Sequence, residues 1–458
     1  MSNAEHIVRG ESARLLSGGV IDVCRGENSR SEFSTDRQRS AATPRSGRVY
    51  DVAVVGAGIV GLSTALVLAR QGYSVALVER RPPGRVMGEL GFDIRTVALT
   101  PASVSFLHEL DGLEADRLSP IETMRVWEFD GAASLHFRPD SASACPPGLP
   151  SALAYVAENS AVTTRLWTAA RKQLDTHAPT SVTGLVVERD AVRLDGPDIT
   201  ARLVVAADGT DSPVGTMAGV VRRVERGRGQ HAIATVARAT LAHGNTAYQR
   251  FGRSGPVALL PLNRTGDQGG TGGGDTESNV AVIWSTSAPE HDRLKSLGDE
   301  AFMGALGRET EDALGPFEAV DRRIGFPVRQ SLAADFNPMD RVLVVGDAAR
   351  TMHPLAGQGV NIGLEDARAI GVTATGADLG APGTWRAFAR ERRLRSKLMI
   401  AAMRTLLAAY SGSWASNAWV RLARNTGIRW IDSSSAAKSQ LVREAMGLGP
   451  LGLGNASR

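Results

Sequence analysis

The sequence is poor in cysteine and has no long apolar run. Its two cysteines, Cys24 and Cys145, lie far apart, and two distant cysteines form neither a disulfide framework nor a zinc site. The eight histidines show no pair at metal-ligand spacing, so we expect no metal. No stretch of consecutive apolar residues is long enough to span a bilayer. These absences favour a reducing, cytoplasmic setting.

The charge of the chain is nearly balanced. Lys and Arg total 52 and Asp and Glu total 48, a net charge of +4, which gives no argument for nucleic-acid binding because no face yet concentrates the charge. Residues 1–47 are rich in Ser and Arg and lack the apolar core of a secretory signal. Their acidic residues argue against a transit peptide. We therefore expect a disordered extension over this segment.

A β-α-β unit is predicted directly after the extension. Residues 49–55 are apolar and β-branched and predict a buried strand. A glycine turn follows, then a helix over 62–70 that ends before Gly72, then a strand over 74–78. With 458 residues, 43% of them hydrophobic, the chain can bury a large core, and its length suggests two or three domains. The unit begins a doubly wound sheet of the α/β class.

The glycine turn has the spacing of a dinucleotide site. Gly56 permits the tight turn, Gly58 lets the backbone approach a pyrophosphate, and Gly61 lets helix and strand pack closely. Glu79 ends the second strand at the position from which an acid binds ribose hydroxyls. A second match begins at Gly447, but it follows no predicted strand and has no room for a helix. We interpret that match as a false positive.

Two aspartates follow short apolar strands later in the chain. Asp208 comes after a strand over 203–207, and Asp347 after one over 341–345. Ligands of open α/β sheets bind at such carboxyl ends. Between these strands lie further strands, from about residue 121 to 137 and from about 231 to 286, with a Gly-rich loop over 264–278 that we expect to be mobile. The nucleotide domain is therefore predicted to be discontinuous.

Residues 385–410 predict a basic amphipathic helix. Such a helix can lie on a membrane surface, or it can pack one face on its own domain with its arginines in water, which is the commoner arrangement.

The run over residues 346–366, beginning Gly346-Asp347-Ala348, resembles the flavin-contacting signature of class A, single-component flavoprotein aromatic hydroxylases. Within that class it is most similar to the ubiquinone-biosynthesis hydroxylases. Supporting segments are Asp93-Ile94-Arg95 with Ala98-Leu99, and residues 206–212, 255–262, 326–327 and 427–447. The resemblance spans about residues 50–447 and implies FAD as the cofactor.

The resemblance implies an FAD-binding Rossmann domain of the glutathione-reductase type, interrupted by a mostly antiparallel substrate-side sheet and followed by C-terminal helices. The implied bounds are 1–47 for the extension, 48–120 with 150–225 and 335–380 for the FAD domain, 121–149 with 226–334 for the substrate domain, and 381–458 for the helical segment. NAD(P)H would bind transiently, because no second glycine motif of this kind offers it a domain.

The resemblance also implies roles for single residues. Asp347 would bind the ribityl chain or pyrophosphate, and Asp208 would help to hold the pyrophosphate. Arg95 would reach the cofactor, and Arg165 is a further candidate. Gly346 is a further implied cofactor-binding residue. In the turn after residue 350, His353 would shape the turn, and the backbone at Pro354, Gly357 and Gly359 would approach the flavin ring.

The implied reaction is hydroxylation of a polyprenylphenol ring by NAD(P)H and O2 through a C4a-hydroperoxyflavin. The protein would be cytoplasmic, with peripheral contact to the inner membrane or a biosynthetic assembly. Two alternatives stay open, namely a hydroxylase of a small soluble phenol and a non-catalytic subunit of such an assembly. A halogenase is disfavoured because no Trp-x-Trp-x-Ile-Pro stretch occurs.

Overall fold

The computed structural model describes residues 48–129, 134–139, 146, 148–225, 229–252, 254–263, 278–353 and 358–410. The expected extension over 1–47, most of the Gly-rich loop, the second glycine match and the segment 427–447 lie outside these residues. Contacts join the two main sheets within one unit, Ser46–Arg458. The expected division into domains stays a prediction.

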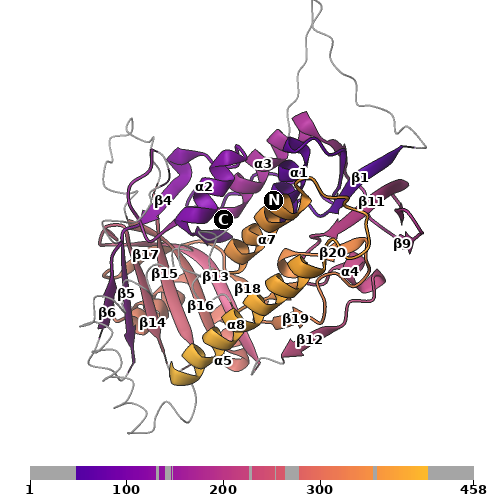
Figure 1. Cartoon of the computed structure of the whole chain (residues 1–458). Helices are drawn as coiled ribbons and strands as arrows, with labels where there is room; N and C mark the ends of the chain where they lie inside the picture. Colours follow the sequence, from indigo (N-terminus) through magenta and orange to yellow (C-terminus); the bar gives the residue numbers. More distant parts are fainter. Residues whose placement is uncertain are drawn as a thin grey trace, which may run out of the picture. The chain divides into compact units, whose positions relative to one another are not determined.

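A seven-stranded sheet carries the glycine turn (Figure 1). Its central strands are parallel and apolar, and Val52–Val55 are buried in β1 because helices and loops cover both faces. Two antiparallel strands extend one edge. In spatial order the strands are β8 (Asp175–His177), β2 (Val75–Val78), β1 (Val49–Val55), β11 (Ile199–Ala206), β10 (Val192–Asp195) and β9 (Gly184–Val187), with β20 (Val342–Val344) paired to β11.

An eight-stranded sheet forms the second large layer. Its ladders are antiparallel except for the parallel pair β14 and β5, as the resemblance implied. The strands are β17 (Phe317–Val320), β13 (Gln230–Ala239), β16 (Asn279–Ser287), β15 (Pro256–Leu262), β14 (Thr246–Phe251), β5 (Thr123–Glu128) and β6 (Ser134–Phe137), with β18 (Ile324–Pro327) paired to β13.

Two three-stranded sheets connect these layers. One consists of β3 (Thr96–Leu99), β7 (Ala154–Glu158) and β4 (Leu118–Ile121), and the other of β12 (Arg222–Glu225), β19 (Gln330–Ala333) and β21 (Arg350–Thr351). Strand β21 directly follows the 3-10 turn η3 (Gly346–Ala348), so the second sheet supports the turn that carries Asp347.

Local chemistry accounts for the start of α2 and the end of α1. Thr100 accepts a hydrogen bond from the Ser103 amide and caps α2, whose first residue is Pro101. Gly72, with a φ of +90°, follows the end of α1. The helices are α1 (Ile59–Arg70), α2 (Pro101–Glu109), α3 (Asn159–Gln173), α4 (Pro213–Met217), α5 (Ala288–Ser296), α6 (Asp299–Thr310), α7 (Gln358–Ala374) and α8 (Arg386–Tyr410), besides the 3-10 helix η1 (Ala115–Arg117).

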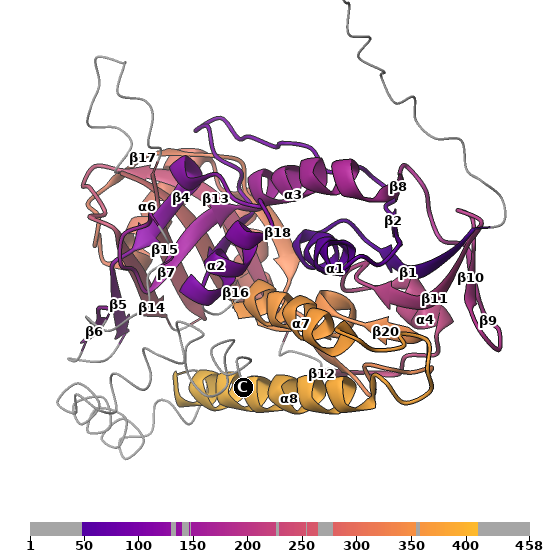
Figure 2. The ribbon, with the colours of Figure 1, turned by 45° about the horizontal axis from the view of Figure 1, so that its top comes forward.

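Helix α1 packs between α3 and α7, and α8 lies against α7 (Figure 2). One face of α8, including Phe388, Ala389, Ile400 and Met403, is buried. The helix therefore packs on its own fold, the commoner of the two expected arrangements. The expectation that its arginines lie in water is wrong for Arg392, which is 2% exposed.

Candidate FAD site

The glycine turn joins β1 to α1 with no room for side chains at two positions. A Cβ on Gly56 would lie 2.4 Å from the Ala207 carbonyl oxygen, and φ at Gly56 is +107°. A Cβ on Gly61 would lie 2.0 Å from the Gly56 carbonyl oxygen. A Cβ on Gly58 would meet nothing within 4 Å. The turn thus presents open space at the start of α1, where N–H groups and the helix dipole favour a phosphate.

Glu79 supports the glycine turn through its carboxylate. One oxygen accepts from the Ala57 amide at 2.6 Å, and the other accepts from the Arg81 amide at 2.7 Å. The side chain is half-buried, and each oxygen retains a lone pair for a ribose hydroxyl. Glu79 therefore holds the turn in place, and its contact with a ribose stays a prediction.

Asp208 follows β11 and caps the short helix α4. Its carboxylate accepts from the Ser212 hydroxyl and, at 3.0 Å, from the Val214 amide. Burial raises the pKa of Asp208, although the bond from Ser212 opposes the shift. Its neighbour Ala207 contacts Gly56, so Asp208 lies beside the glycine turn. Its carboxylate is already used to hold the backbone there.

Asp347 lies in η3, directly after β20. Its side chain is accessible to solvent, and among the described residues it has no hydrogen-bond partner. Partial desolvation raises the pKa of Asp347, while the charges of Arg350 and Arg222 oppose the shift. An accessible carboxylate between two cations and beside an open turn is suited to accept hydrogen bonds from a polyol such as the ribityl chain.

Close packing between α1 and α7 brings the two motifs together. A Cβ on Gly363 would lie 2.5 Å from a methyl of Val60, and a Cβ on Gly346 would lie 3.3 Å from the same side chain. One glycine at each position therefore lets α7 and η3 approach the first turn of α1. The two helices begin side by side, and their dipoles favour negative charge between them.

The first turn of α7 has space for a ligand. A Cβ on Gly359 would meet nothing within 4 Å. The implied ring contacts at Pro354 and Gly357 lie outside the described residues.

Arg95 directly precedes β3, and backbone hydrogen bonds hold it against the start of α3. Its amide donates to Asp93 at 3.0 Å, and its carbonyl accepts from the Asn159 amide at 2.9 Å. Asp93 is 1% exposed and also accepts from the Ser160 amide. The Arg95 side chain is exposed, and no partner for it occurs in the described part of the chain. Its guanidinium is therefore available to a ligand.

Arg165 lies away from the glycine turn, contrary to the expectation of a flavin contact. Its Nε donates to the Asp111 carbonyl at 3.2 Å, and the Asp111 carboxylate accepts from Arg70 in the last turn of α1. The 12 residues of α1 place that end roughly 18 Å from the turn. Arg165 therefore does not belong to the site.

His353 is 4% exposed. Burial lowers its pKa to about 4, so the imidazole is neutral at pH 7. Its expected role in shaping the turn stays a prediction.

Three features of the site were not predicted from the sequence. Asp366 on α7 is 0% exposed and accepts from the Gly346 amide at 3.1 Å. Asn361, also on α7, donates to the Ala98 carbonyl and accepts from the Thr100 amide. Arg222 lies close enough to Asp208 and Asp347 for its charge to affect both. A polar residue inside an otherwise apolar helix face was the available signal for Asp366 and Asn361.

Within the described residues no group of His, Cys, Asp or Glu could hold a metal ion. No described helix is both long and apolar enough to cross a membrane.

Residues 49–376 match the protein family described as FAD binding domain. The chain is 33% identical to ubiquinone hydroxylase UbiL of Rhodospirillum rubrum, over 90% of this chain and 94% of that protein. It is 29% identical to 3-demethoxyubiquinol 3-hydroxylase of Escherichia coli, over 87% and 98%. It is 26% identical to the human mitochondrial ubiquinone biosynthesis monooxygenase COQ6, over 86% and 92%.

Solved structures share the fold. p-Nitrophenol 4-monooxygenase PnpA from Pseudomonas putida aligns with a TM-score of 0.66 at 19% identity, over 88% of this chain and 99% of that one. A flavoprotein/dehydrogenase from Cytophaga hutchinsonii aligns with a TM-score of 0.64 at 15% identity, over 87% and 93%.

Proposed function

The chain belongs to the ubiquinone-biosynthesis family of FAD-dependent aromatic hydroxylases, and we propose that it hydroxylates the ring of a polyprenylphenol intermediate. It is an FAD-dependent monooxygenase, and hydroxylation in ubiquinone biosynthesis is its activity. The observation that carries the choice of substrate is the 33% identity to UbiL over 90% of the chain. NAD(P)H and O2 are the co-substrates of the proposed reaction.

The residues at the site fit FAD. Gly56 and Gly61 admit no side chain, while Gly58 opens onto free space at the N-terminus of α1. We assign the pyrophosphate to this space, because backbone N–H groups and the helix dipole suit a phosphate. We assign the ribityl chain to Asp347, whose carboxylate is accessible. Bound FAD would supply the redox chemistry, namely uptake of hydride from NAD(P)H and activation of dioxygen, with one oxygen atom transferred to the ring and the other released as water.

The protein contributes position and electrostatics at the ring end of the site. The N-terminus of α7 directs N–H groups and a partial positive charge toward the space before Gly359, which stabilises negative charge at the pyrimidine edge of a flavin. Asn361 ties this helix to β3 and α2 through its two bonds. Arg95 supplies a cation whose backbone is fixed at both its amide and its carbonyl. His353 stays neutral and adds no charge.

We further propose that the enzyme acts at the surface of the inner membrane, where a polyprenyl substrate resides. The outer face of α8 supports this location. Leu394 and Leu398 are 56% and 47% exposed and lie among the cations Arg390, Arg393 and Lys397. Exposed leucines among basic residues are typical of interfacial helices.

The test uses the purified enzyme loaded with FAD. NAD(P)H oxidation is measured with a demethoxy polyprenylphenol and, separately, with simple hydroxybenzoates, and the product is examined by mass spectrometry. We expect oxidation to be stimulated by the polyprenylphenol and the product to gain one oxygen atom. Stimulation by hydroxybenzoates alone would instead favour a soluble-phenol hydroxylase. A colourless protein that fails to bind added FAD would favour a non-catalytic subunit.

A deletion strain provides the matching test in the cell. Loss of the enzyme should lower ubiquinone and accumulate one precursor that lacks a ring hydroxyl, and the structure of that precursor identifies the carbon attacked. An unchanged quinone profile would contradict the proposal. Complementation with an Asp347→Ala variant serves as the control for a chain that folds but holds FAD poorly.

A further inference from the structure

A pocket of about 490 Å³ lies between α8 and the segment that joins β19 to β20. Its size is within the usual range of small-ligand sites. Four cations and two carboxylates line it, and the cations are Arg386, Arg390, Arg393 and Lys397. We refer to it as the α8 basic pocket. No described residue of the FAD site lines it, and neither the proposed reaction nor the flavin uses it.

The charges inside the α8 basic pocket are not balanced. Arg386 approaches Asp340 at 3.8 Å, and the Asp335 carboxylate accepts from the Asn337 backbone N–H at 3.0 Å. Arg393 and Lys397 have no ion-pair partner in the described part of the chain. The lining therefore carries four positive and two negative charges, and it keeps an excess of positive charge.

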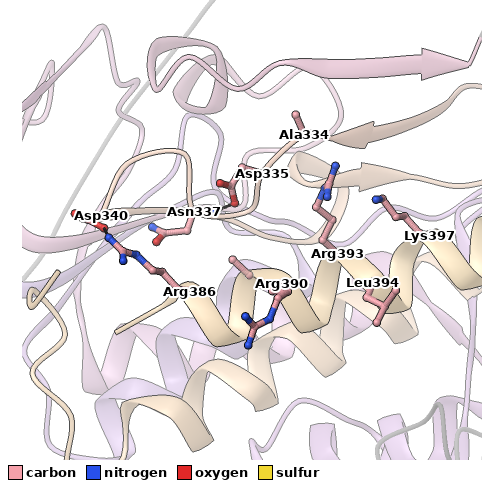
Figure 3. A pocket seen from close by; sticks show the side chains of 10 residues that line it. Ala334, Asp335, Asn337, Asp340, Arg386, Arg390, Arg393, Leu394 and Lys397 are labelled. Carbon is pink, nitrogen blue, oxygen red and sulfur yellow. Dashed lines mark hydrogen bonds and ion pairs between the residues drawn. The ribbon is translucent and has the colours of Figure 1, made fainter. Parts of the chain in front are cut away.

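Arg393 and Lys397 point toward the segment opposite α8. Figure 3 shows both side chains rising from the helix toward Ala334 and Asp335, whereas Arg390 and Leu394 point to the other side. The Nε of Arg393 is buried and, among the described residues, has no hydrogen-bond acceptor. A buried donor without an acceptor is costly, so an anion that enters the pocket would supply the bond that the protein lacks.

We propose that the α8 basic pocket binds a phosphate group, which Arg393 and Lys397 contact together. Arginine matches phosphate with its planar fork of donors, and lysine adds a compact charge. The phosphate can belong to a soluble molecule or to a phospholipid headgroup. The exposed Leu394 at the rim, which points to the same side as Arg390, suits the lipid, because an apolar side chain outside the pocket would meet acyl chains. This proposal does not depend on the hydroxylation reaction.

The experiment measures binding by the FAD-loaded enzyme to two probes. Inorganic pyrophosphate is titrated by calorimetry, and vesicles of phosphatidylcholine with and without phosphatidylglycerol are used for co-sedimentation. Binding to pyrophosphate alone identifies a soluble phosphate. Binding to the anionic vesicles, with pyrophosphate as a competitor, identifies a headgroup. Binding to neither probe overturns the proposal.

Variants locate the site of binding. Arg393→Gln and Lys397→Ala should each weaken binding about tenfold, as expected for the loss of one charged hydrogen bond. Lys172→Ala removes an exposed cation from α3 and should leave binding unchanged. If Arg393→Gln lowers the melting temperature, Lys397→Ala still decides, because Lys397 is exposed. Equal binding by Lys397→Ala and the parent protein would overturn the proposal, as would an equal loss in Lys172→Ala.

Discussion

Asp366 holds together the turn that carries Asp347, and its replacement by Asn should expose this role. One carboxylate oxygen accepts from the Gly346 amide and from Arg350, and the other accepts from the Nε of Arg392 at 2.7 Å. Arg350 and Arg392 are each 2% exposed. Asp366 therefore joins η3, β21, α7 and α8 at one buried point.

The cost of Asp366→Asn follows from this burial. Burial opposes ionisation of Asp366, but the charges of Arg350 and Arg392 outweigh it and hold its pKa below the ordinary value. A depressed carboxylate pKa contributes stability above the unfolded-state pKa, and this stability is lost as the pH falls through the folded-state pKa. Near pH 7 the contribution is complete. Removing one partner of a buried ion pair costs about 3–5 kcal/mol, which corresponds to a fall of about 3–5 °C in Tm for a chain of this length.

The assay compares thermal unfolding and FAD affinity of the parent, Asp366→Asn and a control, Asp378→Asn. Asp378 also pairs with an arginine, Arg202, but the two side chains are 56% and 42% exposed. An exposed pair contributes about 0–1 kcal/mol, so the control should remain close to the parent. Asp366→Asn should unfold earlier and also bind FAD more weakly, because the Gly346 turn loses its support. Equal Tm values for the two variants would refute the reasoning.

Three further predictions concern the flavin site. Gly58→Ala should leave the Tm of the FAD-free protein unchanged and weaken FAD binding in a flavin titration, whereas Gly56→Ala should lower that Tm because its Cβ meets a carbonyl at 2.4 Å. Asp347→Asn should raise the Kd for FAD about 10- to 100-fold, the loss of a charged hydrogen bond, with little change in the Tm of the FAD-free protein. His353 has a folded-state pKa of about 4 against an ordinary 6.5, so its stability contribution is complete above pH 6.5 and falls by about 3 kcal/mol as the pH drops to 4. Urea unfolding of His353→Gln across this range should show a shallower loss, and a slope equal to that of the parent would contradict the pKa.

Local chemistry made part of this fold predictable. The bounds expected for β1 agree with the structure, Val49–Val55, because a β-branched run and a following glycine are both local signals. The expected start of α1 at residue 62 was three residues late, since Ile59 is the first helical residue. The early turn contains glycine, which lowers helix propensity, so sequence alone placed the boundary too far along the chain.

Distant contacts were not predictable in the same way. The Arg392 side chain meets Glu365 and Asp366 across 27 and 26 residues of sequence. Helical spacing from Phe388 places Arg392 on the apolar face, but no local pattern identifies its acidic partners. Arg165 is the converse case, a predicted cofactor contact that the structure does not show. Its type and neighbourhood suited a cofactor contact, but α3 directs it to the far end of α1.

The acidic residues of the site fall into two groups. Some have carboxylates that already accept hydrogen bonds from the protein backbone, and one does not. Glu79 and Asp208 were assigned to the ligand from their positions after strands, and the structure gives the carboxylates of both to backbone amides. Asp366 is likewise occupied, whereas no described residue pairs with Asp347. A carboxylate that holds the protein backbone stabilises the fold even without cofactor, while an accessible carboxylate without a protein partner is hydrated and is free to bind a ligand. Substitution of the first three should therefore lower the stability of the FAD-free protein, and substitution of Asp347 should lower FAD affinity alone. Position at the end of a strand thus predicts which acids lie near a dinucleotide, and the existing bonds of each acid predict whether its substitution also destabilises the FAD-free protein.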